Sequence, residues 1–127
     1  MYYKIKVSNV PDKKGIVTYL TEAENFGEAG YKIIQIIGTE PEVEEIKLMK
    51  NIKPAINEKY SDKNKLYMIK IAEDIIQEDM SYKTVKYELP VFANDAIELT
   101  DKVNDYIAQG LSNMRLTTIS ETKWIYV

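Results

Sequence analysis

The chain has 127 residues, a formal net charge of −3, and neither cysteine nor histidine. The two missing residue types exclude disulfides, thiolate or imidazole metal sites and histidine acid–base catalysis. The length and a hydrophobic content of 45% fit a single compact domain over residues 1–127, and no run approaches the roughly 20 apolar residues of a membrane span.

The first segments predict a β-hairpin. Tyr2–Ser8 alternates in a period of two, which is typical of a half-buried strand. Pro11–Gly15 carries turn residues, and Ile16–Ala23 is the predicted return strand. Because strand-like alternation begins at once, we expect no signal or transit peptide and a cytoplasmic location. The inward face of the first strand holds Tyr3, Ile5 and Val7, and the outward face holds Tyr2, Lys4 and Lys6.

An amphipathic helix follows, with a defined beginning and end. Asn25 is the predicted N-cap, and Glu28 completes a capping box three residues later. Gly38 fits the left-handed residue that follows many helix ends. The apolar stripe that we expect against the sheet consists of Phe26, Ala29, Gly30, Ile33 and Ile37.

A third strand is predicted over Val43–Ile52, where Ile46 and Leu48 point inward and Pro54 ends the strand. Residues 55–64 are polar and rich in turn residues. We interpret them as a connector between two halves of the chain, residues 1–54 and 65–127.

The second half repeats this order of elements. Leu66–Ile71 matches the first strand in its alternation. Glu73–Asp79 is predicted to be an acidic loop, and Ser81–Leu89 is predicted to be the return strand. Within that strand, Tyr87 is interpreted as the counterpart of Tyr19.

A second helix and a last strand complete the pattern. The helix is predicted over Asn94–Gln109 and is closed by Gly110. Its Asp95-Ala96 pair is interpreted as the counterpart of Glu28-Ala29. Arg115–Val127 is predicted to be one strand, because it is rich in β-branched and aromatic residues.

The sequence therefore predicts an α+β fold built from a duplicated strand–strand–helix–strand repeat. We expect six strands in one mostly antiparallel, curved sheet with both helices on one face. The competing interpretation is a chance similarity between two α/β segments, and the matched first strands favour duplication over it. Open sheet edges favour a homo-oligomer.

Three stretches resemble one known family: Tyr19–Ile33, Lys65–Lys83 and Ile119–Val127, the last of which carries a Ser-Glu-Thr-Lys signature. The family consists of small proteins with a domain of unknown function, from gut bacteria of the Bacteroides group and from their phages. The resemblance covers nearly the whole chain. The resemblance implies an origin, a fold, and a bacterial host or a phage-infected cell as the location. It implies no function, because the family has no assigned activity. The sequence departs from the family at residues 124–126, where smaller or acidic residues are expected.

Aromatic and basic side chains recur on the strand faces that point away from the predicted helices. Aromatic rings form stacking platforms for unpaired bases, and lysine contacts phosphates. The competing interpretation is an outer sheet face that is solvated or buried in a dimer. The candidate nucleic-acid-binding or interface residues are Tyr2, Lys4, Lys6, Lys70, Tyr82, Lys86, Trp124 and Tyr126.

The remaining polar groups do not form a catalytic or metal site in this interpretation. Ser120 and Lys123 are three residues apart on a predicted strand, so their side chains point to opposite faces and cannot form a Ser–Lys pair. The acidic groups at 40–45 and 73–79 lack calcium-loop spacing, and they fit solvated loops and edge protection. Nucleotide-binding and hydrolase motifs are missing from the sequence. We therefore expect a protein that is not an enzyme and needs neither metal nor cofactor.

Two functions follow from these observations. The first is a non-enzymatic binding protein that holds single-stranded nucleic acid on the aromatic and basic sheet face, in a phage or mobile-element setting. The alternative is a structural or protein–protein interaction component, such as a virion-associated or regulatory homo-oligomer, without nucleic-acid binding. The net charge of −3 favours the alternative, because nucleic-acid binders are usually basic. A membrane partner is not expected.

Overall fold

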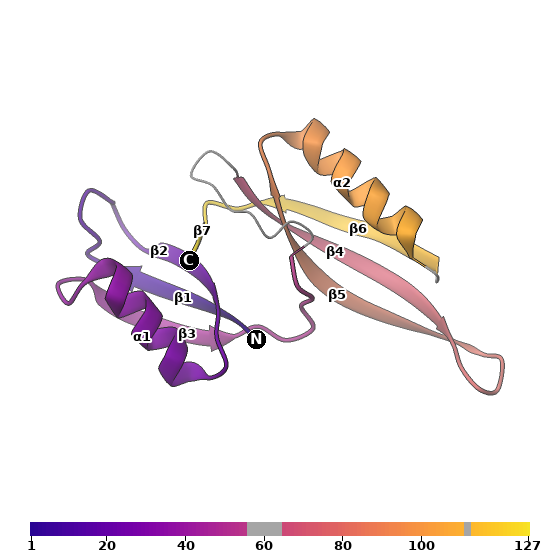
Figure 1. The fold of residues 1–127 in the computed structure, drawn as a ribbon, viewed down its shortest axis with the longest axis horizontal. Coiled ribbons are helices and arrows are strands. Elements are labelled where there is room, and N and C mark those ends of the chain that lie inside the picture. Colours follow the sequence, from indigo (N-terminus) through magenta and orange to yellow (C-terminus); the bar gives the residue numbers. More distant parts are fainter. Residues whose placement is uncertain (56–64, 111–112) are drawn as a thin grey trace. The chain divides into compact units, whose positions relative to one another are not determined.

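The computed structural model describes residues 1–55, 65–110 and 113–127. The chain divides into two compact units (Figure 1). Unit 1 comprises Met1–Lys50 together with Lys123–Val127, and unit 2 comprises Asn51–Thr122. The chain therefore leaves unit 1 after Lys50 and returns to it at Lys123. The predicted connector lies, apart from Ala55, outside the described residues.

Unit 1 contains the strands β1 (Tyr2–Ser8), β2 (Val17–Glu22), β3 (Glu42–Leu48) and β7 (Ile125–Tyr126), and the helix α1 (Phe26–Ile37). Its sheet has the order β3-β1-β2-β7. β1 pairs antiparallel with both of its neighbours, while β2 and β7 are parallel. The core between sheet and helix is formed by Tyr3, Ile5, Val7, Tyr19, Ala23, Ala29 and Ile33.

Unit 2 contains the strands β4 (Lys65–Ile76), β5 (Tyr82–Ala93) and β6 (Asn113–Glu121), and the helix α2 (Ala96–Gln109). Its sheet has the order β5-β4-β6, and both pairings are antiparallel. The core between this sheet and α2 is formed by Tyr67, Ile69, Ile71, Tyr87, Leu89, Val91, Ala93, Leu99 and Val103.

The two units have the same element order, and in each the first strand is central, between the second and the third. The ladder between the first and third strands shifts register between Lys6 and Val7 in unit 1 and between Lys70 and Ile71 in unit 2. These two steps occupy the same place in the matched strands Tyr2–Val7 and Leu66–Ile71. A β-bulge of this kind bends a strand and increases its twist.

The chain is α+β with mostly antiparallel pairing, but the prediction of one six-stranded sheet was wrong. Within the described residues the strands form two sheets. Arg115–Val127 is not one strand, because β6 ends at Glu121 and β7 pairs with β2 in the other sheet. Edge pairing uses backbone groups that nearly every residue carries, so side-chain composition did not reveal the break.

The predicted capping of α1 is confirmed. The Asn25 side chain accepts a hydrogen bond of 2.8 Å from the Glu28 backbone N–H, and Gly38 follows the helix with a φ of 80°. Ala29 and Ile33 are buried as expected, whereas Phe26 is 53% exposed. Its ring still meets Tyr3 edge-on at 5.0 Å between centroids.

Two details of the predicted second half were wrong. Glu73–Asp79 is not a loop, because β4 continues to Ile76 and pairs with Tyr82 across the hairpin. The turn that closes this hairpin is made by the Gln77 N–H donating to the Ser81 carbonyl at 2.7 Å. The β-branched residues at 75 and 76 favour the longer strand.

In the register of the unit 2 sheet, Leu89 and not Tyr87 takes the position that Tyr19 has in unit 1, so the predicted match of Tyr87 with Tyr19 was wrong. Tyr19 lies opposite Ile5, and Leu89 lies opposite Ile69, the residue that matches Ile5. The caps then match as well: Asp95 occupies the place of Asn25, and not that of Glu28.

Neither of the two helices in the described part of the chain is long and apolar enough to cross a membrane.

Candidate functional site

The helix-free face of the unit 1 sheet holds most of the sequence-predicted site residues. Because β1 points Tyr3, Ile5 and Val7 into the core, the side chains between them point to the opposite face. Ile125 and Val127 also pack on the core, which places the neighbouring Trp124 and Tyr126 on the helix-free face. The alternation of side chains thus places Lys4 and Lys6 on the helix-free face, as the sequence predicted.

Two rows of side chains cross this face in register. In one row Lys47 of β3 lies opposite Lys4 of β1, which lies opposite Leu20 of β2, next to Tyr126 of β7. In the other row Glu45 lies opposite Lys6, which lies opposite Thr18. We call the set Lys4, Lys6, Lys47, Trp124 and Tyr126 the aromatic–basic face.

Lys4 and Trp124 form the centre of this face. The Lys4 Nζ lies 4.8 Å from the centroid of the Trp124 ring, within the distance at which a cation is attracted by the negative ring face. The two residues are distant in sequence, and β7 brings them together by pairing with β2. The ring thus presents a surface that already holds a cationic group.

Lys47 was missed by sequence reasoning. It is exposed and lies directly opposite Lys4, and like charges in that position destabilise a sheet. The predicted inward positions of Ile46 and Leu48 carried the necessary signal, since alternation puts the residue between them on the outer face. Two lysines facing each other favour an anionic group between them.

Tyr2 does not belong to the accessible part of the face. It is only 6% exposed, and Leu20 on the same face is fully buried. The prediction that Tyr2 is a stacking platform is therefore wrong, because a buried ring offers no surface to a base. Alternation indicated which face the residue occupies but not whether that face is covered there.

The other sequence-predicted residues lie in unit 2. Lys70 and Lys86 are exposed on the helix-free face of its sheet, on neighbouring strands two register positions apart. Tyr82 is 71% exposed and lies at the far end of the β4–β5 hairpin, opposite Ile76. The eight residues predicted as one surface are thus divided between the sheets of two units.

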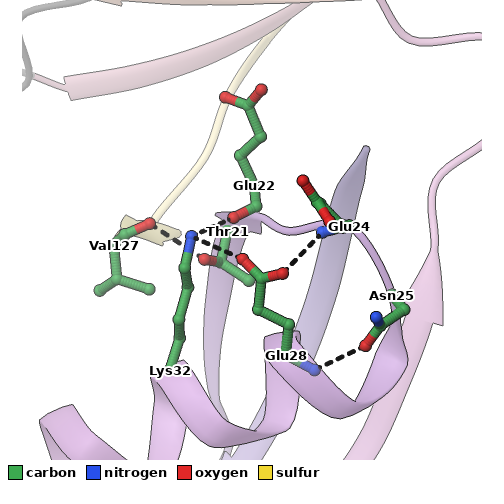
Figure 2. A network of polar contacts seen from close by, with 7 residues as sticks. All are labelled: Thr21, Glu22, Glu24, Asn25, Glu28, Lys32 and Val127. Atoms are coloured by element: carbon green, nitrogen blue, oxygen red, sulfur yellow. Dashed lines mark hydrogen bonds and ion pairs between the residues drawn. The ribbon is translucent and has the colours of Figure 1, made fainter.

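A pocket of about 340 Å³ lies at the corner of unit 1 where β2 leads into α1. Lys32 donates from Nζ to the Glu22 carbonyl at 2.5 Å and approaches the Glu28 carboxylate at 3.7 Å (Figure 2). Thr21 donates from its hydroxyl to the Val127 carbonyl at 3.1 Å in the same network. Unit 2 repeats the lysine contacts, which argues that they are structural.

In unit 2, Lys102 donates to the Phe92 carbonyl at 2.6 Å and pairs with Glu98 at 2.8 Å. Bonding to Lys102 holds the pKa of Glu98 below its usual value. Glu98 also accepts from the Asn94 N–H at 2.8 Å, as Glu28 does from the Glu24 N–H at 3.3 Å. The lysine joins the helix to the end of the preceding strand in both units.

Two observations concern the polar groups of the described residues. These residues contain no group of acidic side chains that could hold a metal ion. Burial and a 3.0 Å bond to the Tyr106 hydroxyl raise the pKa of Tyr87 far above its ordinary value. The phenol therefore stays neutral and is a packing group.

The chain was compared with protein-family models, with curated proteins and with solved structures, and none of them matches it.

Proposed function

We propose that this protein is a non-enzymatic binding protein that holds single-stranded nucleic acid on the aromatic–basic face of unit 1. The observation that carries the proposal is the position of Lys4 over the Trp124 ring at 4.8 Å, with Lys6 and Lys47 on the same face. Aromatic platforms flanked by cations are the usual means of binding unpaired strands without sequence preference.

In the proposed mechanism, a base stacks on Trp124 and displaces the Lys4 ammonium from the ring. Lys4 then contacts a phosphate together with Lys47, which lies opposite on β3. Each stacked base contributes about 1–3 kcal/mol. The phosphate also relieves the repulsion between the two lysines, so affinity gains from both effects.

Trp124 is the only tryptophan in the sequence, so its fluorescence reports this face alone. A titration with oligo-dT at low salt is expected to quench the emission and to saturate at micromolar oligonucleotide. With three lysines on the face, the logarithm of the binding constant should fall with the logarithm of salt with a slope of about −2. An emission that stays unchanged up to saturating oligonucleotide would exclude the proposal.

The matched control uses the lysines of unit 2. Lys4→Glu combined with Lys47→Glu is expected to abolish quenching at low salt, because two phosphate contacts become repulsive. Lys70→Glu combined with Lys86→Glu makes the same change of charge on the helix-free face of the other sheet. Equal losses in both double variants would show a general charge effect, in contradiction to a site on unit 1.

A second candidate function, a protein–protein interaction component, is supported by the outer face of α1. Tyr31 is 64% and Ile34 is 46% exposed, whereas the matching positions of α2 are the exposed Asp101 and Asn104. Large exposed apolar side chains that neighbour each other on a helix are typical of interfaces. In this candidate function the protein forms a homo-oligomer or binds another protein through α1.

Grafting the residues of α2 onto α1 tests the second function. Tyr31→Asp with Ile34→Asn should abolish an oligomer that forms through α1, as measured by light scattering. Trp124→Ala with Tyr126→Ala should leave that oligomer intact and abolish the binding of fluorescently labelled oligo-dT, which is followed by anisotropy because this variant has no tryptophan. If the α1 variant kept the oligomer and the Trp124/Tyr126 variant lost it, the interface would lie on the aromatic–basic face, and the first function would lose its support.

We further propose that the two units are copies of one strand–strand–helix–strand segment, each with a curved sheet. The support is the match of capping pairs, lysine contacts and bulge positions between the two units. The resemblance at residues 19–33, 65–83 and 119–127 supports an origin in Bacteroides-group bacteria or their phages and a cytoplasmic role there. Deep sequencing of phage and host genomes for single-repeat relatives tests both ideas.

A further inference from the structure

We propose that β7 is an exchangeable strand, and that two copies of this chain form a dimer in which each copy donates β7 to β2 of the other. The proposal rests on the position of β7, which completes the sheet of unit 1 although the chain reaches it from unit 2. It goes beyond the proposed nucleic-acid binding, because the binding site it concerns is the edge of β2.

Residues 125–127 are held at the edge of β2 by both main-chain and side-chain contacts. The Val127 N–H donates to the Leu20 carbonyl at 3.0 Å, and the Thr21 hydroxyl donates to the Val127 carbonyl at 3.1 Å. Ile125 and Val127 pack against the core of unit 1. Without β7, this edge would expose strand groups and apolar surface that readily accept another strand.

A second copy of the chain supplies the segment that fits this edge. The contacts named above join residues 125–127 to β2 and the core of unit 1, so the same segment from another copy can make the same bonds. Exchange of an identical element between protomers costs little for this reason. In such a dimer, β7 of the second copy would form the same parallel pairing with β2 that the single chain already contains.

The connection that would move is short. The Thr122 N–H and hydroxyl both bond to the Leu66 carbonyl, at 3.0 and 2.7 Å, which fixes Thr122 to β4. Trp124 is placed beside Lys4 in unit 1. Lys123 is exposed and joins these two anchored residues, so a change of path at this position suffices for exchange.

The other crossing of the chain uses the same kind of pairing. Ile52 forms a parallel bridge with Glu88 of β5, supported by bonds of Lys53 N–H to the Glu88 carbonyl at 2.9 Å and of Glu88 N–H to the Asn51 carbonyl at 2.7 Å. The segment that follows the third strand of each half thus pairs in parallel with the second strand of the other half. Parallel pairing with the second strand of the other half therefore occurs at both crossings, through the strand β7 at one and through a single bridge at Ile52 at the other.

Deletion of Lys123 tests the proposal in the full chain. The deletion shortens the connection by about 3.5 Å, and short, strained hinges favour domain swapping. Light scattering is expected to show twice the 14.7 kDa of one chain, with the dimer dissociation constant at least ten-fold lower than in wild type. The Trp124 emission should stay as in wild type, because Trp124 still docks on a unit 1.

Deletion of Lys13, in the exposed turn between β1 and β2, is the matched control and should leave the mass of wild type unchanged. Ile125→Asp added to the Lys123 deletion should restore the monomer and shift the Trp124 emission to the red. A Lys123-deleted chain that stays monomeric, or a dimer that survives Ile125→Asp, overturns the proposal.

Wild-type protein provides a second measurement in case the Lys123 deletion does not fold. Refolding at high protein concentration should trap a dimer that refolding at low concentration does not give, and Ile125→Asp should remove it. A trapped dimer insensitive to Ile125→Asp, or no dimer at any concentration, contradicts β7 exchange. Neither result changes the test of oligonucleotide binding, which uses Trp124 quenching.

Discussion

α1 and α2 agree on the side that faces their sheet and differ on the side that faces away from it. Each begins with a capping box, buries a pair of positions (Ala29 and Ile33, Leu99 and Val103), and sends a lysine back to the carbonyl at the end of the preceding strand. On the outer side, Tyr31 and Ile34 of α1 correspond to Asp101 and Asn104 of α2.

This difference separates what the fold requires from what it leaves open. The shared contacts satisfy backbone groups at the helix start and the strand end, which any such unit must satisfy. The outer positions make no demand on the fold, so an apolar pair in one unit and a polar pair in the other points to a use outside the unit. The two sheets also differ, because β2 in unit 1 pairs with the additional strand β7, which contains Tyr126 and follows Trp124.

The largest expected effect concerns the first buried position of each helix. Leu99→Ala should lower the free energy of unfolding by about 2–5 kcal/mol, because it leaves a cavity in a fully packed site. Ala29→Leu should also destabilise, by about 1–3 kcal/mol, because the matching site in unit 1 has no room for the larger side chain. Urea unfolding followed by circular dichroism measures both, and a stabilising Ala29→Leu would show that unit 1 leaves as much space at this position as unit 2 does.

The capping residues should give smaller and equal effects. Asn25→Ala and Asp95→Ala each remove a 2.8 Å bond to the backbone N–H of a glutamate. Each is expected to cost about 1 kcal/mol of stability. Thermal unfolding of the two single variants and the double variant should show additive losses, and a loss in one unit alone would break the equivalence.

Substitution of the glycines of α1 is expected to raise the stability of the protein, in contrast to the substitutions above. A Cβ at Gly30 would lie at 3.4 Å from the Ile46 side chain, whereas one at Gly27 would lie at 3.3 Å from the Asn25 capping oxygen. Gly30→Ala should therefore raise stability by about 0.5–1 kcal/mol through helix propensity. Gly27→Ala should gain less, because it crowds the cap. A larger gain at Gly27 in the same denaturation assay would refute this account.

The smallest effect is a pH dependence in unit 2. Bonds to Arg115 at 2.6 Å and to Thr84 at 2.7 Å lower the pKa of Asp74 below its ordinary value of 3.8. A lowered pKa in the folded state means that the stabilisation is complete above the unfolded value and is lost as the pH falls through the folded one.

Stability should therefore fall slightly below about pH 4. Arg115→Ala should raise the Asp74 pKa toward 3.8 in a carboxyl NMR titration. An unchanged titration in that variant would show that the ion pair is not formed in solution. Lys65→Ala serves as the control, because it removes an exposed ion pair with Glu121 on the same sheet.

Much of the candidate site could be predicted from local patterns. Alternation in β1 placed Lys4 and Lys6 on the helix-free face, and the same pattern in β3 would have added Lys47. The burial of Tyr2 could not be predicted this way, because alternation indicates the face of a sheet and not what covers it. The contact between Lys4 and Trp124 was equally out of reach, since it depends on which strand edge β7 joins.

The sequence alone determined the two helices, the cap of α1, the order of the elements before the last strand, and the sheet face to which the β1 side chains point. These features depend on side chains a few residues apart, so the local pattern carries them. Only the tertiary structure decided that the strands form separate sheets, that Leu89 and not Tyr87 matches Tyr19, and that residues 123–127 return to unit 1. Sheet membership depends on pairing between backbone N–H and C=O groups, which are the same in nearly every residue, and no pattern of side chains encodes it.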